Sequence, residues 1–65
     1  MSIKDGFFTN SDGEEFRVRD VVVVEEVVAA AGKPYYEVIF SGGHHVSIRE
    51  DYFSRASFLS AWRAA

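Results

Sequence analysis

Residues 35–50 of this chain read Tyr-Tyr-Glu-Val-Ile-Phe-Ser-Gly-Gly-His-His-Val-Ser-Ile-Arg-Glu. Two runs rich in β-branched and aromatic residues flank a pair of glycines, a pattern that is typical of a β-hairpin. Apolar residues alternate with polar ones along these runs, so the pairing of the two strands decides which side chains share a face. This stretch allows the fold of the rest of the chain to be predicted, whereas the sequence limits the function only to broad classes of protein.

The length of the glycine turn sets the register of this hairpin. A two-residue turn at 42–43 would mix polar and apolar residues on each face. A three-residue turn at 41–43 places Val38 opposite Val46 and keeps one face apolar, and Gly43 can adopt the left-handed conformation that such a turn requires. We therefore predict the three-residue turn. The apolar face then consists of Tyr36, Val38, Phe40, Val46 and Ile48. The opposite, outer face consists of Tyr35, Glu37, Ile39, His45, Ser47 and Arg49.

The part of the chain before the hairpin is also predicted to be mainly β-structure. Residues 7–9 form a short β-like run that ends at the Asn-Ser-Asp-Gly turn signal of 10–13. Residues 16–19 alternate as in a half-buried strand. The four valines at 21–24 do not alternate, which favours a strand buried on both faces. Residues 30–34, Ala-Ala-Gly-Lys-Pro, are predicted to be a loop.

The hydrophobic period changes after the hairpin. Phe58, Leu59 and Trp62 have the spacing of one helical face, and either Asp51 or Ser54 can cap the start of that helix. A helix of about three turns is too short to be stable alone in water, so it must pack on another element. We predict that it covers the apolar face of the hairpin.

The predicted fold class is therefore α+β, with residues 1–65 forming one small domain. It is an antiparallel β-meander of three or four strands, SH3-like or curved, followed by one C-terminal amphipathic helix. The layout of a glycine turn, a valine-rich strand, a Val-x-Phe-x-Gly hairpin and a helix resembles the small curved-sheet and SH3-like units of many phage and bacterial accessory proteins.

Size and composition point to association. The chain has 65 residues and no cysteine, so neither disulfides nor thiolate metal sites can stabilise it. The conformational entropy of ordering so short a chain roughly cancels the gain from its buried area. A valine strand buried on both faces would need a cover that one helix cannot supply, and a second copy of the chain would supply it. We expect a homo-oligomer of two or more copies.

Charge and hydropathy exclude other classes. The net charge of −3 makes duplex nucleic acid an unlikely partner, because that ligand calls for concentrated positive charge. No apolar run approaches the roughly 20 residues that span a bilayer, and the first residues lack the apolar stretch of a signal peptide. We expect a cytoplasmic protein with no membrane partner.

Catalytic motifs are missing from the sequence. It contains no nucleophile elbow, no Walker loop and no dinucleotide fingerprint. His44 and His45 are neighbours on a predicted strand, so their side chains point to opposite faces and cannot easily hold one metal ion. We predict no enzyme activity, no cofactor and no metal site.

Aromatic and basic side chains are the candidate binding residues. Tyr35 and Arg49 face each other across the predicted hairpin, and aromatic residues and arginine are enriched in binding hot spots. The whole candidate set comprises Tyr35, Ile39, His45, Arg49, Tyr52, Arg55 and Trp62.

Three functional hypotheses follow. The first is a non-enzymatic, homo-oligomeric binding protein, comparable to phage-encoded inhibitors of host defence, that occludes a host protein. The second is an oligomeric sponge that sequesters an anionic small molecule, such as a cyclic nucleotide, between subunits. The third is a transcriptional or single-strand nucleic-acid accessory factor that uses an aromatic face with Arg17 and Arg19.

Overall fold

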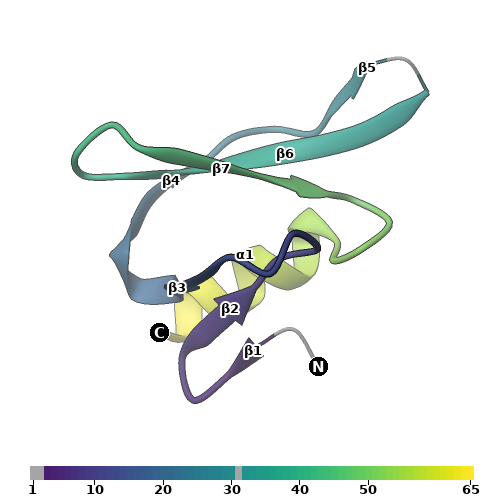
Figure 1. Ribbon diagram of the computed structural model, residues 1–65. Helices are drawn as coiled ribbons and strands as arrows, with labels where there is room; N and C mark the ends of the chain where they lie inside the picture. Colours follow the sequence, from purple (N-terminus) through teal and green to yellow (C-terminus); the bar gives the residue numbers. More distant parts are fainter. Residues whose placement is uncertain (1–2, 31) are drawn as a thin grey trace.

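Two antiparallel sheets and one helix build the protein. The computed structural model describes residues 3–30 and 32–65. Among these, the α+β class with a single C-terminal helix is confirmed (Figure 1). The elements in chain order are β1 (Ile3–Lys4), β2 (Phe7–Thr9), β3 (Glu15–Arg17), the 3-10 helix η1 (Val18–Asp20), β4 (Val21–Val24), β5 (Val28–Ala30), β6 (Lys33–Phe40), β7 (His45–Arg49) and α1 (Arg55–Ala64).

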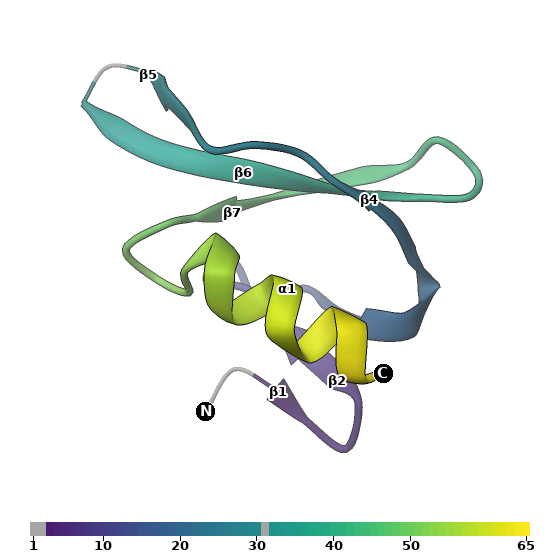
Figure 2. The ribbon, with the colours of Figure 1, turned by 180° about the vertical axis from the view of Figure 1, so that it is seen from behind.

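The longest strand, β6, is the centre of the larger sheet. It pairs with β7 along one side and with both β4 and β5 along the other, all antiparallel. The smaller sheet has the order β1-β2-β3. Both α1 and the smaller sheet lie on the same side of the four-stranded sheet, as the two opposite views show (Figures 1 and 2). Among the described residues, one face of the four-stranded sheet is therefore covered and the other is not.

The predicted register of the β6–β7 hairpin is confirmed. Val38 lies opposite Val46, and the backbone N–H of Phe40 donates to the carbonyl of His44 at 2.8 Å. The N–H of Gly43 donates to the carbonyl of Phe40, which closes the three-residue turn. Gly43 has a φ of +87°, a left-handed conformation that costs glycine little. The turn and the hydrophobic alternation thus specify the same pairing.

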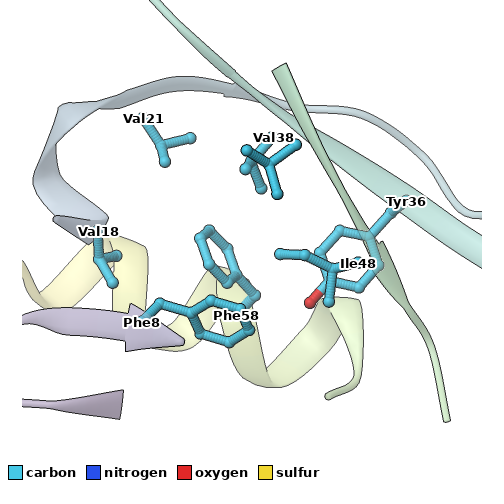
Figure 3. Packing of buried hydrophobic residues seen from close by; sticks show 8 residues of the cluster. Phe8, Val18, Val21, Tyr36, Val38, Ile48 and Phe58 are labelled. Atoms are coloured by element: carbon cyan, nitrogen blue, oxygen red, sulfur yellow. The ribbon is translucent and has the colours of Figure 1, made fainter. Parts of the chain in front are cut away.

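The core lies between the covered face of the four-stranded sheet and the elements packed against it. Ring centroids of Phe8 and Phe58 are 5.4 Å apart in an edge-to-face arrangement, which joins β2 to α1. The hydroxyl of Tyr36 donates to the carbonyl of Phe53 at 2.8 Å, so this buried phenol is satisfied. The buried cluster consists of Phe8, Val18, Val21, Tyr36, Val38, Val46, Ile48 and Phe58 (Figure 3).

The C-terminal helix packs as predicted and begins after Ser54, one of its two expected caps. Ser54 Oγ accepts a hydrogen bond from the backbone N–H of Ser57 at 3.2 Å. Glu50 adds a carboxylate that accepts from the N–H of Arg55 at 2.9 Å. The predicted turn at 10–13 is also present, and the N–H of Gly13 donates to the carbonyl of Asn10.

The prediction that 21–24 is buried on both faces is wrong. Val21 is buried, but the side chains of Val22 and Val23 are 50% and 43% exposed. The strand β4 pairs only with β6 and contains an irregularity between Val21 and Val23, so Val22 is an extra residue at a bulge. A run of valines suits an edge strand as well as a buried one, because β-branching favours extended backbone in either place.

Two boundaries also differ from the prediction. The alternating run of 16–19 is not one strand, because β3 ends at Arg17 and η1 turns the chain from one sheet into the other, with Val18 buried. The predicted loop at 30–34 is shorter, since Ala30 and Lys33 are paired in β5 and β6. Ala31 lies outside the described residues. Neither β1, of two residues, nor β5, of three residues, was predicted.

Candidate functional site

The uncovered side of the four-stranded sheet carries the outer face predicted from the hairpin. Strand alternation places Tyr35 and Ile39 there, because their neighbours Tyr36 and Val38 are buried in the core. The described part of the chain packs against the opposite side of this sheet (Figure 2). The outer face is thus a solvent-facing surface whose residues come from β4, β5, β6 and β7.

Tyr35 and Arg49 meet at one end of the outer face, as predicted. They are direct partners across β6 and β7, and Val28 of β5 lies opposite Tyr35 on the other side. Arg49 Nε and Nη2 donate to the two carboxylate oxygens of Asp51 at 3.1 and 2.8 Å. This hydrogen-bonded ion pair raises the pKa of Arg49 and lowers the pKa of the Asp51 carboxyl. The guanidinium of Arg49 is therefore hydrogen-bonded within the chain.

Ile39 and His45 form the other end of the outer face. Ile39 lies opposite His45 on β7 and opposite Val23 on β4. Between the two ends stands Glu37, whose carboxylate accepts from Ser47 Oγ at 3.2 Å and lies 3.7 Å from His45 Nε2. The polar groups of this face are thus linked to one another within the chain.

The apolar part of the outer face is exposed enough to contact a partner. Val23 and Val28 are 43% and 50% exposed, while Tyr35 and Ile39 are half-buried. Val28 was missed at the sequence level, because β5 was not foreseen and the residue had no predicted face. The only sequence pattern that could have indicated a strand here is the pair Val27-Val28, between two glutamates and a run of alanines.

The other three candidate residues do not join this face. The hydroxyl of Tyr52 donates to the carbonyl of Thr9 at 2.9 Å, and its ring meets Phe8 edge to face. Arg55 Nε donates to the carbonyl of Glu25 at 2.7 Å. Trp62 Nε1 donates to the carbonyl of Val21 at 2.8 Å. These contacts tie α1 and the segment before it to the sheets, which is a structural role.

The histidine pair is divided between the two sides of the hairpin. The imidazole of His44 stacks on Phe40, with ring centroids 5.7 Å apart, while His45 belongs to the outer face. Within residues 3–30 and 32–65, no group of three or more His, Asp or Glu side chains is placed to hold a metal ion.

Comparison with known proteins gives no relative for this chain: no family model, no curated protein and no solved structure matches it. The longer of the two described helices, α1, has ten residues and is too short to cross a bilayer.

Proposed function

We propose that this chain is a non-enzymatic binding protein that occludes a surface of another protein with the outer face of its four-stranded sheet. The observation that carries the proposal is the apolar exposure of Val23, Val28, Tyr35 and Ile39 on a face that the rest of the described chain leaves uncovered. An antiparallel sheet can keep one face in water, but that face is then normally polar.

The chemistry of the outer face suits a protein surface better than a small anion. Its guanidinium, on Arg49, already binds Asp51, and its second carboxylate is Glu37. Tyrosine flanked by aliphatic side chains and a held arginine is typical of interface hot spots. A nucleotide pocket that combines the candidate residues has less support, because Arg55 and Trp62 do not join the outer face and instead donate to the backbone carbonyls of Glu25 and Val21.

Self-association is the second part of this proposal. In the absence of the partner protein, a copy of the chain presents the same apolar side chains, so a two-fold contact would bury Tyr35 and Ile39 of both copies, and the partner would compete with this contact. Sedimentation equilibrium measures this directly. We expect a mass above that of one chain, falling to the monomer mass when Val23→Asp introduces a charge into the contact. A monomer at all accessible concentrations would remove self-association and leave only the partner protein.

Capture from a bacterial lysate tests the binding function. Immobilised wild-type chain should retain a stoichiometric protein partner, and Val23→Asp should lose it because a buried carboxylate would lack a counter-charge. Val22→Asp is the matched control: it puts the same charge on the same strand at similar exposure, but Val22 lines a hollow beside Phe40 and His44. Equal retention by both variants, or by neither, would contradict the assignment of the partner to the outer face.

A further inference from the structure

The three-stranded sheet also has a side that faces away from the core. Ile3, Phe8 and Phe16 are aligned across β1, β2 and β3, and all three pack into or against the core. The adjacent row across the same strands contains Lys4, Phe7 and Arg17. Because side chains alternate along a strand, this second row projects from the opposite side of the sheet.

An aromatic ring and two arginines border a hollow at this row. The guanidinium carbon of Arg17 lies 5.4 Å from the centroid of the Phe7 ring, a cation–π distance. Arg19, two residues further on, lines the same hollow, together with Asp5, Gly6 and the terminal Ala65. The smaller sheet and the end of α1 lie close together in both views (Figures 1 and 2).

The cations at this hollow form no ion pair within 4.0 Å in the described chain. In residues 3–30 and 32–65, ion pairs within 4.0 Å join His45 to Glu37 and Arg49 to Asp51, and involve neither Lys4, Arg17 nor Arg19. Asp5 supplies the one side-chain carboxylate among the lining residues. Two guanidiniums therefore face one side-chain carboxylate in this hollow, and both also line a neighbouring hollow that contains Glu14, Glu15 and Asp20.

The contact between Arg17 and Phe7 matters for chemistry. A cation–π contact engages the face of the guanidinium and not the N–H donors at its edge, and a planar fork of donors matches two oxygens of a phosphate. Arg19 would supply a second fork, and a base would use the face of the Phe7 ring that Arg17 does not cover. We propose that this hollow binds the phosphate of a nucleic-acid ligand, with Arg17 and Arg19 as the contacting residues.

Binding of fluorescein-labelled oligothymidine of about 12 nucleotides, followed by anisotropy, tests this inference. Wild-type chain should bind the strand, and Arg19→Gln should weaken binding about tenfold, corresponding to about 1.4 kcal/mol. The slope of log affinity against log salt concentration should also fall by about 0.7 for each phosphate contact that is lost. Arg17→Gln should behave in the same way.

Lys33→Gln is the control, because it removes the same charge from an exposed site at the start of β6. Its affinity should stay close to that of the wild type. Competition with ADP separates the two sources of a phosphate. If ADP displaces the labelled strand at near-stoichiometric concentration, the site binds a free nucleotide. If only unlabelled oligothymidine displaces it, the site binds a strand. Failure of the wild-type chain to bind either probe would overturn the inference, as would equal loss of affinity in the Lys33→Gln control.

Thermal unfolding of each variant shows that the fold is kept, since these side chains are exposed. The site lies on the other sheet from the proposed protein-binding surface. Loss of strand binding in Arg19→Gln with unchanged capture of the protein partner would show that the two surfaces act independently.

Discussion

The two faces of the β6–β7 hairpin differ although they alternate residue by residue along the same backbone. The inner face meets α1 and the three-stranded sheet, and Tyr36, Val38 and Ile48 are almost completely inaccessible to solvent. The outer face has Tyr35 and Ile39 at comparable positions, yet no described element covers them. Apolar character alone therefore does not show which side chains stabilise the fold. The position of α1 and the three-stranded sheet shows it.

Substitutions at the neighbours Val38 and Ile39 should show the largest difference between the inner and outer faces. Val38→Ala should lower the free energy of unfolding by about 2–5 kcal/mol, because it leaves a cavity in the core. Ile39→Ala should cost less than about 1.5 kcal/mol, since the side chain is half-exposed and leaves no enclosed cavity. Urea denaturation measures both values. Equal losses would show that the outer face is also part of a packed core.

The turn that sets the alternation can be tested at its two glycines. Gly43→Ala should destabilise the chain by about 1–2 kcal/mol, because an L side chain is strained at a φ of +87°. Gly42 does not have a positive φ, and an added Cβ would meet nothing within 4 Å. Gly42→Ala should therefore be close to neutral in the same denaturation experiment. The opposite ranking would contradict the three-residue turn.

The adjacent tyrosines give a smaller contrast that depends on pH. Burial, with the nearby Glu50 carboxylate, raises the pKa of the Tyr36 hydroxyl well above its ordinary value. A group whose pKa is raised by folding contributes full stability below its unfolded pKa, near 10, and loses that contribution as the pH rises further. We expect the wild-type melting temperature to fall above about pH 10.

Tyr36→Phe should remove most of that alkaline loss, and at neutral pH it should cost about 1 kcal/mol for the hydrogen bond to Phe53. At neutral pH, Tyr35→Phe should cost less than Tyr36→Phe, because Tyr35 lies on the uncovered outer face. Melting curves at neutral and alkaline pH measure both effects. An alkaline loss that persists in Tyr36→Phe would mean that another group causes it.

The sequence predicted those parts of the fold in which two signals agree. The hairpin register follows from hydrophobic alternation together with Gly43. The start of the helix follows from helical spacing together with a capping side chain at Asp51 or Ser54, of which the structure uses Ser54. The valines at 21–24 carried one signal only, β-propensity, which does not distinguish an edge strand from a buried one. Their burial was therefore predicted incorrectly.

Only four of the seven candidate binding residues lie on the outer face, and the reason is similar. Register within one hairpin brings Tyr35 to Arg49 and Ile39 to His45, and the sequence contains that register. The positions of Tyr52, Arg55 and Trp62 depend on how α1 and the smaller sheet meet the larger one. Their partners are the carbonyls of Thr9, Glu25 and Val21, which are 30 or more residues away and cannot be inferred from local pattern.

The most direct test of the central claim, that the outer face binds while the inner face folds, is the affinity of Tyr35→Ala for the captured partner. A hot-spot tyrosine contributes about 2 kcal/mol or more to binding, so the affinity should fall at least about tenfold while the free energy of unfolding stays near the wild-type value. An affinity equal to that of the wild-type chain, in a variant that remains folded, would contradict the claim.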